Sequence, residues 1–324
     1  MKVWRRLLAA GVLTAMLFTL PGCGSGDVPA SSSGSSGAAS SAAVPEPEPV
    51  VVEPAYYHPL TGVGMDEDLS RLRPVAVMIN DLKAAQPQLG VSQADIIYEM
   101  PAEGGITRMV ALFQSLDGVG NLGSIRSTRA YYLELALGHD ALLVHAGGSP
   151  EAYKDIPAWG VDNMDGVNGG SDAKIFWRDA ERRKTKGYEH SLLTSGEKIQ
   201  EYLDQGHFRT EHKDGYAESL RFRDDGTPQG GTAAGKVSLR FSPYKTAVFD
   251  YDAASGKYLV SQFGEAYIDG NTGKQVGVTN VLTLKTRIRL ISGDTAGRMT
   301  ADLTSGGEGM YFCGGQGTES FVFL

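Results

Sequence analysis

The sequence contains little cysteine and lacks the short motifs that mark common catalytic and metal sites. Only two cysteines, Cys23 and Cys313, occur among its 324 residues. No His-Glu-x-x-His, Gly-x-Ser-x-Gly or phosphate-loop lysine motif is present, and no Cys and His residues have zinc-binding spacing. A loop with Asp162, Asp165 and Asp172 does not place oxygen ligands at the alternate positions that a calcium-binding loop requires. The sequence therefore predicts no metal and no cofactor, and it gives little direct support to catalysis.

Positive charge is also scarce. The chain has 30 Lys and Arg residues against 38 Asp and Glu residues, a formal net charge of -8. A protein that binds nucleic acid through its bulk charge needs a basic surface, so no nucleic-acid partner is expected. The apolar fraction of 41% and the charged fraction of 21% are close to those of globular proteins. The length allows two domains, each with its own core.

The N-terminus has the pattern of an export signal. Basic residues precede an apolar run at 7–20 that is too short to span a bilayer, which predicts a signal peptide over residues 1–22. The run ends in Leu-Pro-Gly-Cys, which resembles the signal of bacterial lipoproteins whose cysteine is lipidated after cleavage. We therefore expect a lipid on Cys23 that anchors an extracytoplasmic protein to the outer face of the cell membrane. The alternative is an ordinary signal peptide with a chance cysteine. If Cys23 carries lipid, Cys313 has no partner for a disulfide bond.

Residues 23–57 are rich in Ser, Gly and Ala and then alternate Pro with Glu. Such a composition cannot bury enough apolar surface to fold, so it predicts a disordered tether that holds the following domain away from the membrane.

Residues 58–206 alternate strand and helix signals. Short runs rich in branched residues predict strands at 74–80 and 94–100, and a third strand follows at 106–115 after a Glu-Gly-Gly turn. Helical spacing after residue 127 predicts a helix with Ser127 or Thr128 as its N-cap, and a buried strand follows at 141–149.

Two further helices have N-terminal signals. Ser149 can cap a helix that has Pro150 in its first turn. Thr194 and Glu197 have the spacing of a capping box for a later helix.

The remainder of the chain predicts a different architecture. Residues 207–236 are polar and glycine-rich, which indicates a linker or a long loop. Residues 237–324 contain alternating runs separated by turns, which indicates a mostly antiparallel β domain. The predicted fold class is therefore α+β, with a mixed α/β N-terminal domain followed by a smaller β domain.

Two predicted helix starts form the candidate ligand site. Unpaired N–H groups at a helix start attract anions, glycines let a ligand approach the main chain, and arginine binds carboxylate or phosphate in a bidentate manner. The predicted ligand-binding residues come from the stretches "GSIRSTR" and "HAGGS": Arg126, Ser127, Arg129, His145, Gly147, Gly148 and Ser149. No catalytic residue is predicted.

A structural interpretation of the same residues remains open. The arginines could instead pair with carboxylates of the chain itself, and the candidates near them in sequence are Asp95, Glu99, Glu103 and Glu134. His145 could be a satisfied core histidine. Residues 175–190 mix aromatic and basic residues, and they indicate either a solvated charged face or a contact with a partner or an anionic polymer.

Several long motifs occur in the order typical of one family. They read "HPLTG", "RPVAVMIN", "GVSQADIIYEMPAEGGITRMVALFQS", "GSIRSTRAYYLELALGHDALLVHAGGS", "FWRD" and "EHSLLTS", and later "VTNVLTL". The chain resembles the YerB-like bacterial lipoproteins, whose domains have no assigned function. The resemblance implies a two-domain extracytoplasmic protein of spore-forming and related Gram-positive bacteria. Members of that family usually continue past the "GMYFCGG" stretch with a further hairpin, so we expect the C-terminal domain to lack closing strands and to leave a sheet edge exposed.

Three functions follow as hypotheses. The first is a lipid-anchored binding protein of the cell envelope that recognises an anionic cell-wall ligand or an envelope protein. The second is an enzyme similar to the LytR-type phosphotransferases, which hold a polyprenyl pyrophosphate with arginines. The third is a purely structural interaction protein in which the arginines are paired internally.

Overall fold

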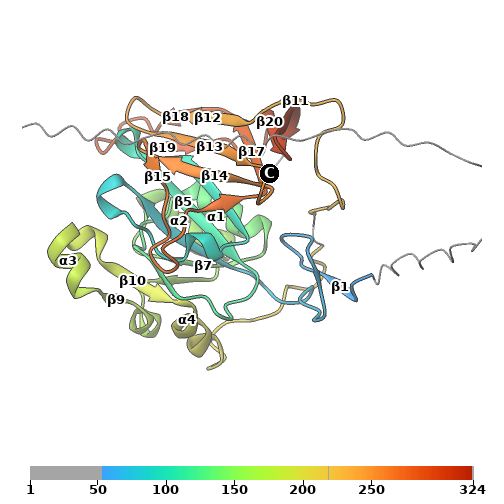
Figure 1. The fold of residues 1–324 in the computed structure, drawn as a ribbon. Coiled ribbons are helices and arrows are strands. Elements are labelled where there is room, and N and C mark those ends of the chain that lie inside the picture. The colour runs from blue at the N-terminus through green and yellow to red at the C-terminus, as the bar shows by residue number, and fades with distance from the viewer. Residues whose placement is uncertain (1–52, 218, 323–324) are drawn as a thin grey trace, which may run out of the picture. The chain divides into compact units, whose positions relative to one another are not determined.

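The computed structural model describes residues 53–217 and 219–322 (Figure 1). The predicted signal peptide, Cys23 and the tether as far as residue 52 lie outside the described residues. Within the described ranges, no helix is both long and apolar enough to cross a membrane.

The first domain is built on a mixed five-stranded sheet in the order β4-β5-β3-β7-β8. Its strands are β3 (Val75–Asp81), β4 (Ile96–Pro101), β5 (Thr107–Phe113), β7 (Leu142–His145) and β8 (Asn163–Asp165). Strand β5 pairs antiparallel with β3 and β4, whereas β7 pairs parallel with β3 and β8. The predicted strands at 74–80, 94–100 and 106–115 are confirmed.

The central strand β3 is buried along its whole length, so both faces of the sheet are covered. Alternate side chains of a strand point to opposite faces, and β3 accordingly contributes to two apolar cores. Val75, Val77 and Ile79 belong to one core, and Ala76 and Met78 belong to the other.

The described part of the chain contains four α-helices: α1 (Ala130–Gly138), α2 (Pro150–Trp159), α3 (Ala180–Lys186) and α4 (Gly196–Leu203). Helix α1 places Tyr132 and Leu133 in the core that contains Met78, and α4 places Ile199 in the opposite core. As predicted, Ser149 caps α2 by accepting a hydrogen bond from Ala152 N. The cap predicted for α4 is wrong by one residue, because Ser195 accepts the bond from Lys198 N.

A second, three-stranded sheet joins segments that flank the candidate site. It has the order β6-β10-β9, with β6 (Asn121–Gly123), β9 (Trp177–Arg178) and β10 (Leu192–Ser195). The 3-10 helix η5 (Tyr188–His190) joins α3 to β10, and η1 (Lys83–Ala85) follows β3. Gly123 has φ 141°, and a Cβ there would lie 2.8 Å from the Leu193 side chain, so only glycine fits this turn out of β6.

The second domain is formed by antiparallel strands, as predicted. One sheet has the order β12-β13-β14-β15 with β16 on β14, and its strands are β12 (Lys236–Arg240), β13 (Thr246–Asp252), β14 (Lys257–Gln262), β15 (Glu265–Ala266) and β16 (Gly277–Val278). The other has the order β11-β21-β20-β17, with β11 (Thr232–Ala233), β17 (Asn280–Lys285), β20 (Gly307–Cys313) and β21 (Gln316–Val322). Two short pairs complete the described strands: β1 (Tyr56–Tyr57) with β2 (Gly64–Met65), and β18 (Ile288–Leu290) with β19 (Met299–Ala301).

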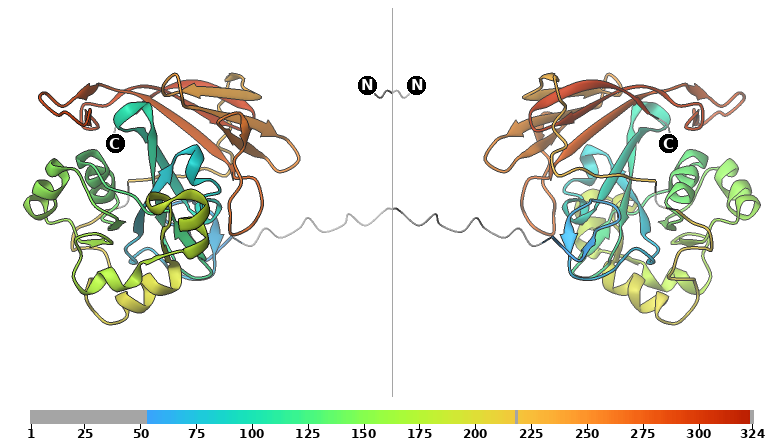
Figure 2. Two further views of the ribbon diagram at one scale, coloured as in Figure 1. Left: turned by 90° about the vertical axis from the view of Figure 1, so that its left-hand side faces the viewer. Right: turned by 90° about the vertical axis from the view of Figure 1, so that its right-hand side faces the viewer.

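The second domain packs against the first (Figure 2), and buried polar contacts join the two. Lys245, which is 1% exposed, donates from Nζ to Asp81 Oδ2 at 2.6 Å and lies 3.1 Å from Glu99 Oε1. Asp269 accepts hydrogen bonds from the backbone N–H groups of Gly90 and Ser92. The α+β fold class is confirmed, and the two domains share core residues as well as these contacts.

Candidate functional site

The stretches "GSIRSTR" and "HAGGS" lie next to each other, as expected. They do not form two helix N-termini with unpaired N–H groups. Arg126 N donates to Met78 O, and Ala146 N donates to Arg126 O, so the segment after β6 runs between β3 and β7. The segment is extended, and α1 begins only at Ala130 with no side-chain cap. The predicted capping by Ser127 or Thr128 is therefore wrong.

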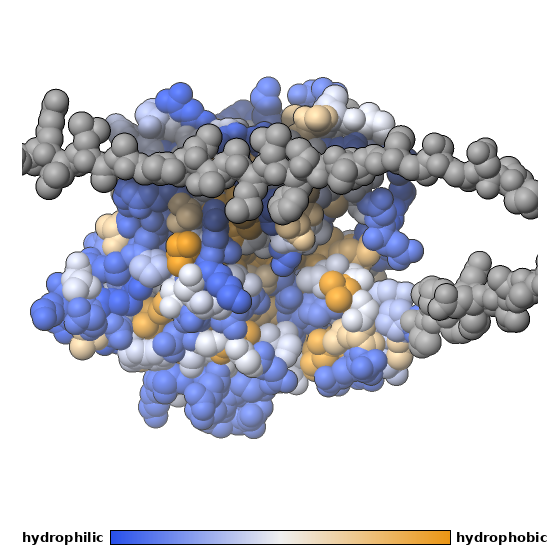
Figure 3. Space-filling view, in the orientation of Figure 1, coloured by the Kyte–Doolittle hydropathy of each residue, from blue (hydrophilic) through white to orange (hydrophobic). Residues whose placement is uncertain are grey.

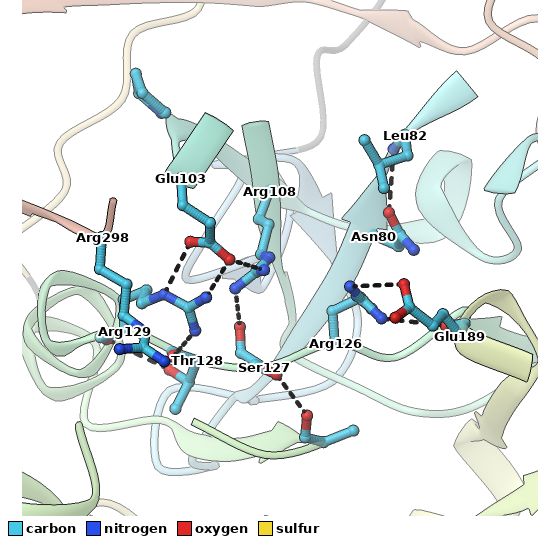
Figure 4. Close-up of polar contacts among 12 residues, drawn as sticks. Asn80, Leu82, Glu103, Arg108, Arg126, Ser127, Thr128, Arg129, Glu189 and Arg298 are labelled. Carbon is cyan, nitrogen blue, oxygen red and sulfur yellow. Dashed lines mark hydrogen bonds and ion pairs between the residues drawn. The ribbon is translucent and has the colours of Figure 1, made fainter. Parts of the chain in front are cut away.

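This extended backbone separates the two arginines. Side chains alternate along an extended chain, so residues three positions apart emerge on opposite sides. Arg129 turns toward Glu103, whereas Arg126 turns toward Glu189 (Figure 4). The structure does not bring the two guanidinium groups together on one ligand position.

The guanidinium group of Arg129 forms an ion pair with a carboxylate of the same chain. Its Nη2 and Nε donate to the two oxygens of Glu103 at 2.5 and 3.2 Å, and its Nη1 donates to Thr128 O at 2.6 Å. Arg129 is 5% exposed. The alternative of internal pairing, with Glu103 among its candidates, therefore describes this arginine.

A second arginine shares the same carboxylate. Arg108 donates from Nη2 to Glu103 Oε1 at 2.5 Å and from Nη1 to Ser127 O at 3.1 Å. Burial alone would raise the pKa of Glu103, but the charges of Arg108 and Arg129 hold that pKa below its usual value. We call Glu103, Arg108 and Arg129 the Glu103 cluster.

The polar groups of the turn at residues 147–149 also form hydrogen bonds within the protein. Gly147 N donates to Asp165 Oδ1, and Ser149 N donates to Thr128 O. The Ser127 hydroxyl donates to Ala146 O. Gly148 forms a parallel bridge with Thr128. These contacts use the groups that were predicted to face a ligand.

His145 is fully buried in the same region. Its Nδ1 lies 2.9 Å from Gly147 O, and its Nε2 lies 3.0 Å from Asn163 Oδ1. Both ring nitrogens have internal partners, as the core-histidine alternative expects. A ligand role for His145, Ser127, Arg129 and the turn at 147–149 stays a prediction that the geometry does not favour.

Arg126 differs from these residues because its interactions are long or incomplete. Nη1 donates to Glu189 O at 3.3 Å, and Nη2 lies 3.7 Å from a Glu189 carboxylate oxygen that belongs to a 71% exposed side chain. Its Nε is buried and has no hydrogen-bond partner. The side chain of Arg126 is 21% exposed. Arg126 is thus the predicted arginine that retains unused donor capacity next to solvent.

His190 lies near Arg126, and Asn80 fixes the tautomer of its neutral ring. Asn80 Oδ1 accepts from Leu82 N at 3.1 Å (Figure 4). Asn80 Nδ2 therefore faces His190 Nδ1 at 2.9 Å. An amide nitrogen only donates, so Nδ1 accepts and the ring proton resides on Nε2. Burial lowers the pKa of His190, and the positive charge of Arg126 lowers it further.

Two more cationic side chains, those of Arg182 and Lys186, lie near this histidine. Arg182 is 8% exposed and donates to three backbone oxygens, those of His190, Pro87 and Ala85. Lys186 donates from Nζ to Gln86 O. The charges of Arg182 and Lys186 also lower the pKa of His190, which places them within electrostatic reach of its ring.

We call the group Asn80, Arg126, Arg182, Lys186 and His190 the Arg126 site. In the part of the chain that the structure describes, no ion pair involves Arg182 or Lys186. Their guanidinium and ammonium groups are held by neutral carbonyl oxygens, so their positive charge is not cancelled. Such an arrangement can stabilise a negative charge brought from outside.

Sequence reasoning identified Arg126 but missed the other members. Arg182, Lys186 and His190 lie within the basic stretch 175–190, which was interpreted only as a charged face or a partner contact. They are more than fifty residues from Arg126, and only the pairing of β10 with β6 brings the segments together. No local spacing could have indicated this convergence.

Comparison with known proteins agrees with this architecture. The family model described as "Protein of unknown function (DUF3048) N-terminal domain" matches residues 60–209, and the model of the DUF3048 C-terminal domain matches residues 237–320. The chain is 33% identical over 264 residues to the putative lipoprotein YerB of Bacillus subtilis (strain 168), covering 81% of this chain and 76% of the relative. It also resembles the crystal structure of YerB protein from Bacillus subtilis with a TM-score of 0.72 and 30% identity, covering 83% of this chain and 87% of that one. The chain therefore belongs to the YerB-like family of lipoproteins with DUF3048 domains.

Proposed function

We propose that this protein is a lipid-anchored, extracytoplasmic binding protein that recognises an anionic group at the Arg126 site. Membership of a lipoprotein family supports the anchor predicted at Cys23. The predicted placement on the outer face of the membrane gives the domain access to ligands of the cell envelope.

The observation that carries the proposal is the incomplete neutralisation of Arg126. Its Nε lacks a partner, and its carboxylate neighbour Glu189 is exposed and 3.7 Å away. A buried donor without a partner costs about 1–3 kcal/mol, so a shift of the Arg126 side chain that brings Nε to a ligand oxygen would recover that amount. A phosphate or carboxylate oxygen is such an acceptor.

The neighbouring groups favour the same ligand chemistry. His190 presents an Nε2–H donor, and Arg182 and Lys186 supply positive charge behind it. Because the chain as a whole has a net charge of -8, a local excess of positive charge is needed to attract an anion. The Arg126 site provides that excess.

Glu189 acts in this proposal as an internal competitor. Its exposed side chain occupies the outer side of Arg126 when no ligand is bound. An external anion would displace it at low energetic cost, since an exposed ion pair contributes about 0–1 kcal/mol. Glu189→Gln should therefore tighten anion binding several-fold.

The test is pyrophosphate binding to the full chain in detergent, measured by isothermal titration calorimetry. Arg126→Gln should weaken binding at least about tenfold, which corresponds to about 1.4 kcal/mol. Arg71→Gln is the matched control, because Arg71 is 77% exposed and its partner is Glu211 rather than a residue of the site. Equal affinities of wild type and Arg126→Gln would reject the site.

The enzymatic and the purely structural alternatives remain predictions. The Glu103 cluster fits the structural interpretation of one arginine, but it does not account for the unpartnered Nε of Arg126. The phosphotransferase analogy rests on the same local arginine pattern, and no further contact among the described residues adds to it.

A further inference from the structure

The basic character of the Arg126 site continues along the surface of α3. The stretch 175–190 contains five Lys and Arg residues and three Asp and Glu residues, in a chain whose net charge is negative. Three of its cations extend beyond the Arg126 site: Arg178, Arg183 and Lys184. We call these three residues, together with Tyr188, the α3 basic surface.

Tyr188 holds two of these cations without neutralising them. The guanidinium carbon of Arg178 lies 3.5 Å from the centre of the Tyr188 ring, and that of Arg183 lies 5.4 Å from it. A cation–π contact fixes a guanidinium group while leaving its full positive charge available to other ligands. Tyr188 itself is 58% exposed, so this stack stands at the surface.

The acidic residues of this stretch do not cancel the charge. Among the described residues, no ion pair involves Arg178, Arg183 or Lys184. Asp179 is engaged in capping α3, where it accepts from Arg182 N at 2.7 Å. The one carboxylate of the stretch that forms an ion pair, Glu189, pairs with Arg126.

The character of the surrounding surface indicates which kind of ligand fits it. The region around α3 is mostly hydrophilic and has no broad apolar patch in the view of Figure 3. A segment that binds a membrane surface presents apolar side chains to the lipid as well as positive charge. A polyanion in the aqueous envelope therefore fits this surface better than lipid headgroups.

From these observations we infer that the ligand of the Arg126 site is part of a linear polymer with repeated phosphate groups. One phosphate would occupy the Arg126 site, and the following phosphates would lie along the α3 basic surface. The inference rests on the proposed function, because the first contact is the same Arg126 site. It adds that affinity increases with chain length.

The inference is tested by measuring how affinity depends on the length of the phosphate chain. End-labelled inorganic polyphosphate and pyrophosphate are titrated with the full chain in detergent, the first by fluorescence anisotropy and the second by calorimetry. The double variant Arg183→Ser plus Lys184→Ser removes two exposed cations that are not members of the Arg126 site. Lys257→Ser plus Lys274→Ser is the matched control, with two exposed cations removed from the second domain.

We expect wild type to bind polyphosphate at least tenfold more tightly than pyrophosphate. The α3 double variant should lose at least fivefold in polyphosphate affinity and show a shallower salt dependence, while its pyrophosphate affinity stays unchanged. Release of fewer counterions on binding explains the shallower salt dependence. The control double variant should change neither affinity.

The two proposals fail in different ways. If pyrophosphate binding depends on Arg126 but the α3 double variant binds polyphosphate like wild type, the polymer inference is rejected and the anion site stands. If Arg126→Gln leaves pyrophosphate binding unchanged, the proposed function itself is rejected. Binding of anionic phosphatidylglycerol vesicles that requires Arg183 and Lys184, without comparable binding of polyphosphate, would replace the polymer by a membrane surface and overturn the inference.

Discussion

Two arginines of one short sequence stretch have opposite environments. Arg129 is buried and makes a two-point contact with Glu103, which it shares with Arg108. Arg126 has one long contact with an exposed carboxylate and an Nε without a partner. The same residue type, three positions apart, therefore serves a structural role in one case and remains available to a ligand in the other.

The difference shows that local composition does not decide what an arginine does. Both residues lie among hydroxyl-bearing and glycine neighbours in "GSIRSTR". Their roles depend on which distant segment reaches each side of the extended chain: the turn at Glu103 on one side, and η5 on the other. The predictions below alter one of these environments or test a third buried charge group against them.

Among the partners of the two arginines, the largest effect is expected when the carboxylate of the Glu103 cluster is removed. Glu103→Gln leaves Arg108 and Arg129 buried next to each other without a compensating negative charge. Removing one partner of a buried ion pair costs about 3–5 kcal/mol, and we expect about 3 kcal/mol because Glu103 is partly exposed. Urea-induced unfolding of the full chain in detergent measures the loss.

Glu189→Gln is the control that tests the comparison itself. It removes the carboxylate beside Arg126, which is exposed, so the free energy of unfolding should change by less than about 1 kcal/mol. Similar losses for Glu103→Gln and Glu189→Gln would show that the two arginines do not differ in the way described.

The Glu103 cluster has two cations for one carboxylate, and the buried group around Lys245 has the opposite ratio. Here one cation faces two carboxyl groups, those of Asp81 and Glu99. Thr107 Oγ1 lies 2.8 Å from an oxygen of each, but a hydroxyl group donates only one proton, so one carboxyl group must itself donate. Burial, together with the neighbouring charge of Asp81, raises the pKa of Glu99 to about 8, which assigns the proton to Glu99.

This protonation predicts a pH-dependent stability. The unfolded chain releases the Glu99 proton near the ordinary value of about 4.3, whereas the folded protein keeps it up to about pH 8. The folded state thus binds more protons in this window, so its stability falls as pH rises from about 4.3 to about 8, by at most about 1.4 kcal/mol per pH unit.

Glu99→Gln keeps the neutral form and should remove this contribution. Relative to wild type, the variant should gain stability in urea unfolding as pH rises from 4.5 to 8. Tyr267 also faces this group, but its pKa is raised well above the usual value, so it does not titrate in this window. A difference between wild type and variant that is independent of pH would contradict the assignment.

Much of the fold was predictable because it depends on local patterns. The alternating branched runs gave β3, β4 and β5, and the Ser149 and Pro150 pair gave the start of α2. The helix start at Ser127 was wrong because the backbone of 126–128 forms bonds with β3 and the turn after β7, which override the capping preference of Ser and Thr.

The candidate site was only partly predictable for the same physical reason. Arg126 stands out in its own stretch, but the residues that define its chemistry come from other segments. Asn80 lies at the end of β3, and His190 lies in η5. Their convergence depends on the antiparallel pairing of β6 with β10, which is a long-range contact that carries no sequence signal near Arg126.

The smallest expected effect is on the titration of His190, and it measures the open environment directly. Burial and the charge of Arg126 hold the pKa of His190 below its ordinary value. A bound dianion adds negative charge next to the ring, so pyrophosphate should raise this pKa. Binding should therefore take up a proton and tighten as pH falls below about 6.5. Nuclear magnetic resonance of isotope-labelled histidine follows the titration, with His190→Gln identifying the signal among the six histidines.

The same titration distinguishes pyrophosphate binding at Arg126 from an effect of pyrophosphate on all histidines. Without ligand, Arg126→Gln removes a positive charge beside the ring and should also raise the pKa of His190. With Arg126→Gln, pyrophosphate should then move the His190 signal much less than in wild type. His207, which stacks on Tyr202 elsewhere in the first domain, is the internal control, and its signal should keep its position. If Arg126→Gln leaves the His190 titration unchanged, Arg126 and His190 do not share one electrostatic environment, and the contrast between the two arginines no longer identifies a binding site.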